Sequence, residues 1–265
     1  MLQLRPEPDS WVGLARFTSA RIALGRAGAS WRTETLVAFR LAHAQARDAV
    51  CRPFDAESVE RRLQQFGCET ARLATNARSR ADFLKRPDLG RTLSEESRQL
   101  LKQNNVAWTR RHLAVLVSDG LSALATEAQA APVLAYLLPL LAQAGWTTYP
   151  VFVVPYARVK LQDEIGALLG AQHTLALLGE RPGLGSPDSL GAYFTYQPGR
   201  DKTDADRNCI SNIRPQGLPP EEAAQKLAQY LIHSKEQRCS GISLKLGSHR
   251  LNPSPQSKRV FESIV

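Results

Sequence analysis

Residues 112–120 read HLAVLVSDG, a short apolar run that ends in Asp-Gly. A run of this length, bounded by turn residues, is typical of a strand that is buried on both faces. Two further runs of this kind follow, VFVVPY at 151–156 and HTLALL at 173–178. Helical patterns at 131–144 and 160–171 separate the three runs. Strands that alternate with helices in this way predict an α/β fold with a doubly wound, mostly parallel, Rossmann-like sheet.

Proline and strand signals define the neighbouring elements. Pro139 predicts a kink or an early end in the helix at 131–144. The segment AYFTYQ at 192–197 predicts another strand. A last helix is predicted to begin at Pro219-Pro220, because proline is favoured in the first turn of a helix.

The chain is predicted to divide into three parts. Residues 1–111 carry helical patterns, residues 112–246 carry the α/β pattern, and residues 247–265 are polar and contain prolines. We therefore expect an N-terminal helical domain, an α/β domain and a disordered tail.

Capping residues followed by apolar periodicity predict the helices of the first part. Thr33 is predicted to cap the first helix, and Asp55 and Ser94 the next two. Apolar positions recur at spacings of three and four on one side of the first helix: Leu36, Phe39, His43, Ala46 and Val50. Because His43 lies on that side, we favour a hydrogen-bonded core histidine over a ligand there.

The charge of the chain is concentrated in its first part. The net charge is +9, and residues 1–111 hold 20 Lys and Arg against 12 Asp and Glu. Of these 20 basic residues 18 are arginine, which is enriched at protein interfaces. Nucleic-acid binding is the alternative, but aromatic residues are not interleaved with the arginines as a stacking platform requires. We expect this part to dock on a partner protein, and we expect no nucleic acid.

The thiols and the N-terminus indicate an intracellular protein. No apolar run approaches the ~20 residues that span a bilayer. The N-terminal residues MLQLRPEPDSW lack a signal-peptide core, so we expect a cytoplasmic location and no membrane. Cys51, Cys68, Cys209 and Cys239 form no CxxC pair, so we expect reduced thiols.

Four segments are expected at one edge of the sheet, because ligands of open α/β sheets bind beyond the carboxyl ends of the strands. Three of them follow the predicted strands: Asp119-Gly120, 156–159 and 179–190. The third reads GERPGLGSPDSL, longer and richer in glycine than a simple connection requires. The fourth segment, at 204–217, reads DADRNCISNIRPQG, and we interpret it as too polar for a core strand. Together the four segments predict a ligand pocket.

The usual catalytic motifs are absent from the sequence. There is no GxxxxGK[ST], GxGxxG, GxSxG or HExxH motif, and no histidine has a partner at metal-ligand spacing. A nucleophilic Cys209 would require a base that the sequence does not place nearby. We therefore predict a binding site without a catalytic group or a metal ligand.

The chain resembles the small (light) subunit of ethanolamine ammonia-lyase over residues ~11–246. The most specific part of the resemblance is the pair GERPGLGSPDSL and DRNCISNIRP. The other matching segments lie at 16–50, 85–91 (KRPDLGR), 118–125, 158–171 and 240–245.

The resemblance implies a partner and a cofactor. In this family a large (β/α)₈ barrel subunit holds ethanolamine and the catalytic residues, and the small subunit closes over adenosylcobalamin from the other side. The family's cobalamin-contacting positions correspond to Val159, Glu180 and Cys209, and we name no catalytic residue here. The implied activity is that of a carbon–nitrogen lyase, in which radical chemistry of the cofactor converts ethanolamine to acetaldehyde and ammonia.

Simpler interpretations remain open for each residue. Glu180 could form a salt bridge with Arg181 or Arg207, Val159 could pack at a helix start, and Cys209 could be an inert thiol. For the whole chain the alternative is a stand-alone α/β small-molecule-binding protein or enzyme.

Two departures from the family pattern affect these expectations. Ala42 stands where the family usually has aspartate, so any contact of that acid with the partner is missing. Some members carry a long N-terminal extension linked with packaging in a bacterial microcompartment, whereas here the domain is expected to start almost at Met1. We therefore favour the plain cytoplasm over an ethanolamine-utilisation microcompartment.

Overall fold

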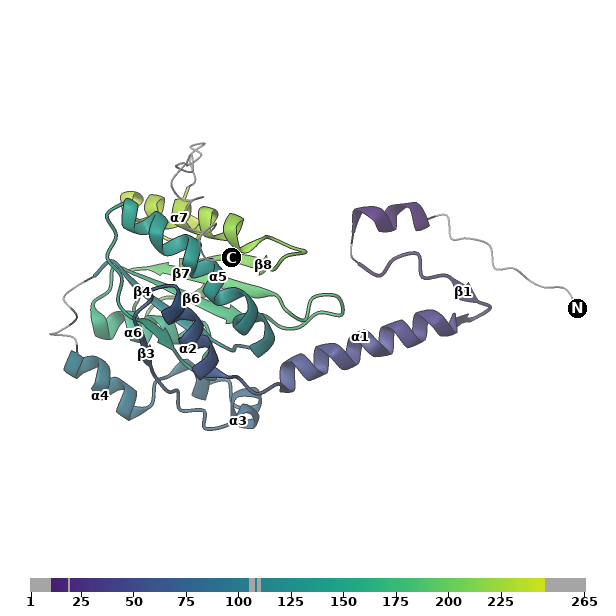
Figure 1. Ribbon diagram of the computed structural model, residues 1–265, viewed down its shortest axis with the longest axis horizontal. Coiled ribbons are helices and arrows are strands. Elements are labelled where there is room, and N and C mark those ends of the chain that lie inside the picture. The colour runs from purple at the N-terminus through teal and green to yellow at the C-terminus, as the bar shows by residue number, and fades with distance from the viewer. Residues whose placement is uncertain (1–10, 19, 105–107, 109–110, 246–265) are drawn as a thin grey trace, which may run out of the picture.

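The computed structural model describes residues 11–18, 20–104, 108 and 111–245, and its centre is a six-stranded sheet (Figure 1). The strand order is β3-β5-β4-β6-β7-β8. The first four of these are parallel, and β7 and β8 are added antiparallel at one edge. The strands are β3 (Thr70–Arg72), β4 (Leu113–Ser118), β5 (Val151–Val153), β6 (His173–Gly179), β7 (Leu190–Tyr196) and β8 (Arg207–Ile213). The predicted α/β fold with a mostly parallel sheet is confirmed.

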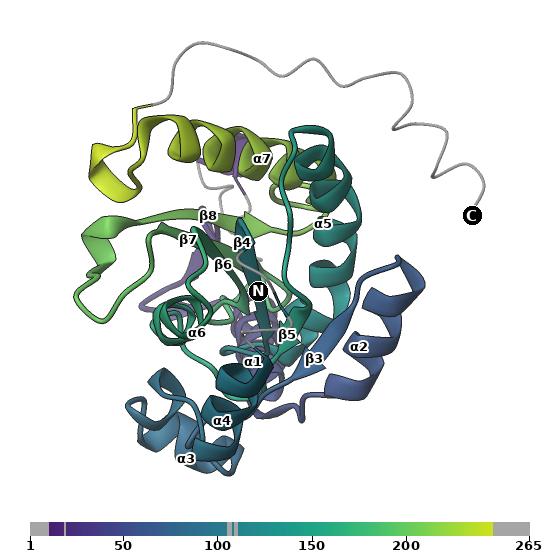
Figure 2. The ribbon, with the colours of Figure 1, turned by 90° about the vertical axis from the view of Figure 1, so that its left-hand side faces the viewer.

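Helices cover both faces of the sheet (Figure 2). One face packs against α2 (Ala56–Gln65), α5 (Ala123–Gln143) and α7 (Pro220–Gln237). The other face packs against α4 (Glu95–Asn104) and α6 (Leu161–Leu169). Val115 of β4 belongs to the first core and its neighbour Leu116 to the second. Because successive side chains point to opposite faces, a strand covered on both sides must be apolar throughout.

Helix α5 is longer than the sequence predicts. It begins at Ala123, where the Ser122 side chain accepts a hydrogen bond from the Ala125 N–H, and it continues past Pro132 and Pro139 to Gln143. The expected early end at Pro139 is therefore wrong. The helix is packed on α2, α7 and the sheet, and tertiary packing of this kind outweighs a local propensity against the helix.

Helix α5 is also long and apolar enough to cross a membrane, judged by length and composition alone. Half of its most apolar window is buried inside the structure, against the sheet, α2 and α7. The core helix of a soluble protein passes the same test, so α5 is weak evidence for a membrane.

Two strands of the six-stranded sheet, β8 and β3, lie where the sequence predicts none. Residues 207–213, part of the segment interpreted as too polar for a core strand, form β8 and pair with β7. Because β8 is an edge strand, Ile210 and Ile213 are the only buried apolar residues among its seven, which leaves an apolar signal too weak to detect. Strand β3 is three residues long and lies in the segment expected to be helical.

The division of the chain at residue 111 stays a prediction. The predicted disordered tail at 247–265 lies outside the described residues.

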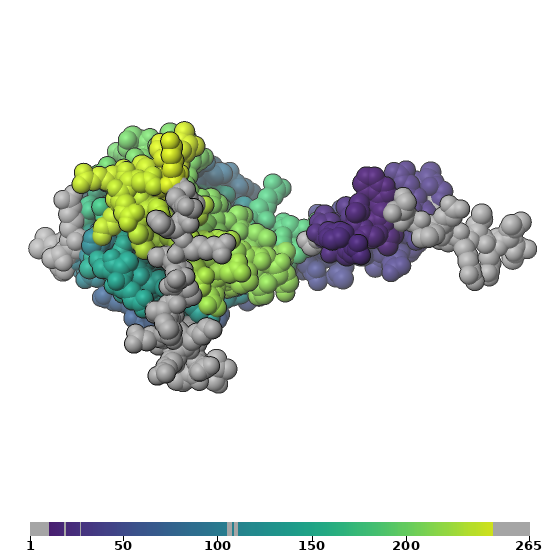
Figure 3. Space-filling view, turned by 90° about the horizontal axis from the view of Figure 1, so that it is seen from above, coloured from purple at the N-terminus to yellow at the C-terminus, as the bar shows by residue number. Residues whose placement is uncertain are grey.

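Residues 11–18 and 20–51 form an arm that projects from the α/β body (Figures 1 and 3). Its axis is α1 (Thr33–Cys51). The 3-10 helix η1 (Val12–Phe17) and the hairpin of β1 (Arg26–Ala27) and β2 (Ser30–Trp31) precede it. The chain folds back along α1, where the Thr35 hydroxyl donates to the Leu24 carbonyl at 3.1 Å.

Three details of the arm and its neighbours test the predicted helix starts. Asp55 accepts a hydrogen bond from Ser58 N–H and caps α2, and Ser94 accepts one from Ser97 N–H at the start of α4, as predicted. Thr33, in contrast, is the first residue of α1, and Arg32 takes the N-cap position.

His43 is exposed, and the expectation of a core histidine is wrong. Its ring stacks on that of Phe39 at a centroid distance of 6.4 Å. Neither hydrophobic core of the described residues includes a residue of α1, because the helix projects away from the body (Figure 3).

Candidate functional site

A crevice forms at the carboxyl ends of the parallel strands. The chain leaves β4 toward α5 on one face and leaves β5 toward α6 on the other, so a gap opens between the two connections. Two adjoining pockets of about 680 and 450 Å³ lie there. They share Arg158 and Val159, which follow β5, and Tyr193 of β7.

The three residues predicted to contact a cofactor line these pockets. Val159 lines both, Glu180 lines the smaller one and Cys209 lines the larger one. They come from the β5–α6 connection, the end of β6 and strand β8 respectively. The sheet thus brings together residues that are 21 and 29 positions apart in the sequence.

Glu180 is held in place by three donors. Its carboxylate accepts hydrogen bonds from the hydroxyls of Ser189 and Ser211, both at 2.5 Å, and from the backbone N–H of Asn212 at 3.2 Å. Among the described residues no cation lies within ion-pair distance of this carboxylate, and Arg207 pairs with Asp163 instead. The salt bridge considered as an alternative is therefore absent from the described structure.

Cys209 and Tyr193 form a cross-strand pair between β8 and β7. Although Cys209 is in contact with solvent, surrounding protein atoms remove enough hydration to raise its pKa to about 11, and the Glu180 charge adds to this shift. Burial also raises the pKa of Tyr193, as do the nearby Cys209 and Glu180. Both groups are therefore protonated at neutral pH, which suits hydrogen bonding or packing and does not suit a nucleophile.

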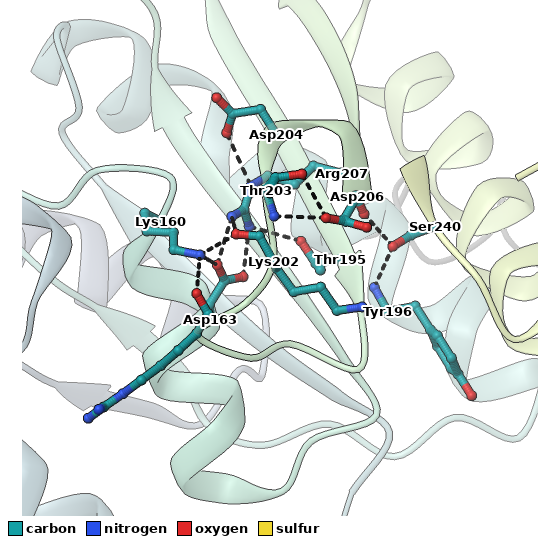
Figure 4. A network of polar contacts seen from close by, with 11 residues as sticks. Lys160, Asp163, Thr195, Tyr196, Lys202, Thr203, Asp204, Asp206, Arg207 and Ser240 are labelled. Carbon is teal, nitrogen blue, oxygen red and sulfur yellow. Dashed lines mark hydrogen bonds and ion pairs between the residues drawn. The ribbon is translucent and has the colours of Figure 1, made fainter. Parts of the chain in front are cut away.

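Arg207, which lines the larger pocket, belongs to a buried ion pair (Figure 4). The two terminal nitrogens of Arg207 each donate to one oxygen of Asp163 at 2.7 Å, and both side chains are at least 95% buried. Lys160 approaches Asp163 at 2.9 Å from the start of α6. Because Asp163 lies on α6 and Arg207 on β8, the pair ties two elements that flank the pocket.

Asp119, which the sequence places at this edge, has a structural role. Its carboxylate is fully buried and accepts from Arg80 Nη1 at 2.6 Å and from the Tyr156 N–H at 2.7 Å. Arg80 begins α3 (Arg80–Lys85), so this contact anchors α3 to the sheet. The adjacent Gly120 lines the smaller pocket.

Several pocket residues were not singled out from the sequence. Arg91, at the end of the 3-10 helix η2 (Leu89–Arg91), lines the larger pocket, and Phe83 of α3 lines the smaller one. Both come from the part expected to be an independent helical domain. The only sequence feature that pointed to Arg91 was its place in KRPDLGR, one of the segments that carry the family resemblance.

Among the described residues no group of three or more His, Cys, Asp and Glu side chains could hold a metal ion.

The structure defines an α/β protein with two adjoining pockets at the carboxyl edge of a mostly parallel sheet. The family model for "Ethanolamine ammonia-lyase light chain (EutC)" matches residues 8–245. This chain belongs to that family, and it is therefore a subunit of a carbon–nitrogen lyase.

Individual relatives agree with this assignment. The ethanolamine ammonia-lyase small subunit of Azotobacter vinelandii is 49% identical over 242 residues, which cover 89% of this chain and 88% of the relative. That of Ralstonia nicotianae is 48% identical, over 89% of this chain and 88% of the relative. That of Xanthomonas campestris pv. campestris is 48% identical, over 91% and 89%.

Proposed function

We propose that this chain binds adenosylcobalamin at an interface with a large, barrel-type subunit, and that the assembled enzyme converts ethanolamine to acetaldehyde and ammonia. The observation that carries the proposal is the convergence of Val159, Glu180 and Cys209 on two adjoining pockets. These residues were named from the family resemblance alone, and they come from three separate segments.

The polar groups of the pockets suit a corrinoid. Cobalamin carries a rim of amide side chains, each with both a donor and an acceptor. Glu180 uses three hydrogen bonds, and a carboxylate has about four acceptor positions, so one remains for an amide N–H. The protonated Tyr193 can donate to an amide carbonyl, and Arg158 Nε is buried without a hydrogen-bond partner.

The division of labour follows from these groups. When bound, adenosylcobalamin supplies the radical chemistry. The residues of this chain bind and orient one side of the cofactor, and their closure over it excludes water. We propose no catalytic residue on this chain.

The arm is the proposed docking surface for the large subunit. Large apolar side chains along it are exposed, among them Phe17 (73%), Val37 and Leu41 (59% each). Exposed apolar side chains in such number mark an interaction surface. The relatives are named small subunits, which supports a larger partner as the occupant.

Co-purification tests this function. The chain is co-expressed with a large-subunit partner, and the complex is assayed for acetaldehyde with and without adenosylcobalamin. We expect a stable hetero-oligomer that is active only with the cofactor. Activity of this chain alone would instead support the stand-alone α/β enzyme. The cytoplasm remains the proposed location, and cell fractionation tests it against packaging in a microcompartment.

A further inference from the structure

The larger pocket at the sheet edge is strongly basic. Its lining includes one acidic residue, Asp204, and five basic ones: Arg91, Arg158, Lys160, Lys202 and Arg207. A cleft lined by charges of one sign concentrates ligands of the opposite sign. The question is which of these cations are free to bind one.

Acidic partners already engage several cations around the pocket. Asp163 forms ion pairs with both Arg207 and Lys160. The exposed Asp204 approaches Arg207 at 3.5 Å.

Just outside the larger pocket, Arg80 pairs with Asp119 at 2.6 Å, and Arg86 pairs with Asp88 at 2.7 Å. For Arg91, Arg158 and Lys202, no carboxylate of the described residues lies within ion-pair distance, and the first two of these cations are held next to each other by the backbone.

The backbone holds Arg91 and Arg158 together. The Arg158 N–H donates to the carbonyl of Gly90, the residue before Arg91, at 2.8 Å. Gly90 is required for this approach, because a Cβ there would lie 2.6 Å from the Tyr156 carbonyl oxygen. The arrangement therefore brings η2 against the start of the β5–α6 connection.

The Arg158 guanidinium is partly fixed in position. It lies over the Phe83 ring at 4.0 Å, and its Nη2 donates to the Phe83 carbonyl at 3.0 Å. Its Nε is buried and has no hydrogen-bond partner. Burial and the positive charges of Arg80 and Arg91 lower its pKa. An anion beside these groups would relieve both the unpaired donor and the repulsion.

We infer that Arg91 and Arg158 bind a phosphate group and that, if the proposed function holds, this group is the phosphodiester in the nucleotide loop of cobalamin. The amide side chains of the cofactor are neutral, so the phosphodiester is the anionic group on its periphery. Arginine is well suited to phosphate because its planar fork of donors matches two oxygens at once. Val159, next to Arg158, lines the same pocket and is one of the proposed corrinoid contacts.

The test compares two corrinoids on the complex with the large subunit. Adenosylcobinamide lacks the nucleotide loop and its phosphate, whereas adenosylcobalamin has both. Dissociation constants are measured by absorbance titration for the wild type, Arg158→Gln, Arg91→Gln and the control Arg61→Gln, which removes an exposed arginine of α2. Arg91 is exposed, and its side chain has no hydrogen-bond or ion-pair partner among the described residues, so its variant is expected to fold even if Arg158→Gln does not.

We expect each pocket variant to bind adenosylcobalamin roughly 10- to 100-fold more weakly, and adenosylcobinamide as tightly as the wild type does. Arg61→Gln should bind both like the wild type. Equal weakening of both corrinoids, or of neither, by Arg91→Gln would overturn the phosphate assignment and leave the proposed function intact. If the wild-type complex binds neither corrinoid, the proposed function fails and the inference fails with it.

Discussion

Glu180 places a carboxylate at the smaller pocket with most of its hydrogen-bonding capacity already used. Ser189, Ser211 and the Asn212 backbone hold it in one orientation. A donor from a bound cofactor would complete its coordination, and the same three groups would lose their acceptor if the carboxylate were removed. Its contribution to binding is therefore measurable by substitution.

Glu180→Ala is expected to weaken adenosylcobalamin binding to the assembled complex by roughly 1–3 kcal/mol, because it leaves polar partners unpaired. Glu180→Gln keeps one carbonyl acceptor and should lose less. Titration of the complex measures both, with Glu57→Ala on the exposed side of α2 as control. An unchanged dissociation constant for Glu180→Ala would contradict the assigned contact.

His173 makes the stability of the fold depend on pH. It is fully buried at the start of β6, and burial, together with Lys235 and His112, lowers its pKa from 6.5 to about 3. Between these two values the unfolded chain binds a proton that the folded chain does not, so stability falls as the pH drops below about 6.5.

Because of this histidine, we expect the free energy of unfolding to be roughly 1–2 kcal/mol lower at pH 5 than at pH 7. Urea unfolding at the two pH values measures the difference, and His173→Asn should reduce it by that amount. Leu175→Ala, a buried change on the same strand without a titrating group, should destabilise equally at both pH values. An undiminished difference in His173→Asn would show that other groups cause it.

At the scale of elements, the end of β6 and the loop after β4 are packed backbone against backbone. Leu121 N–H donates to the Gly179 carbonyl at 2.8 Å. A Cβ on Gly179 would lie 2.0 Å from the Ser122 carbonyl oxygen, and one on Gly120 would lie 2.4 Å from the Gly179 oxygen. These two glycines allow the two backbone segments to lie this close together. The close packing in turn fixes the position of Glu180, the residue after Gly179, beside the smaller pocket.

Gly179→Ala is expected to destabilise the fold by about 3 kcal/mol or more, since backbone atoms rather than a flexible side chain must move. Gly185→Ala in the same loop is the matched control, because no atom lies within 4 Å of the added methyl group. Its stability should change by less than about 1 kcal/mol. Chemical denaturation compares the two, and equal stabilities would contradict the packing described.

At the scale of the whole molecule, the arm and the body are joined at one end of α1. Arg52 pairs with Glu127 of α5 at 2.7 Å, and Arg80 Nε donates to the Val50 carbonyl at 2.8 Å. Farther along the arm, Arg40 and Arg47 are exposed. A surface that makes so few contacts with its own body is available to another polypeptide.

Arg40→Glu and Arg47→Glu are therefore expected to impair assembly with the large subunit while the isolated chain stays folded. Size-exclusion chromatography of the co-expressed complex measures assembly, and circular dichroism of the small subunit measures folding. Arg61→Glu, an exposed charge reversal on α2, should affect neither. Loss of folded small subunit in parallel with loss of complex would contradict an interface role.

By itself the sequence determined the mostly parallel sheet and four of the segments that line the site, because a strand buried on both faces must be apolar at every position and the site lies where such strands end. That signal is local, so HLAVLVSDG and HTLALL could be interpreted without knowing their neighbours. Only the tertiary structure decided that the polar β8 joins the sheet, that His43 is exposed and that Arg91 lies beside Arg158. Each of these outcomes depends on which element packs against the residue. A contact between segments far apart in the sequence produces no hydrophobic periodicity in either segment, so the sequence does not reveal it.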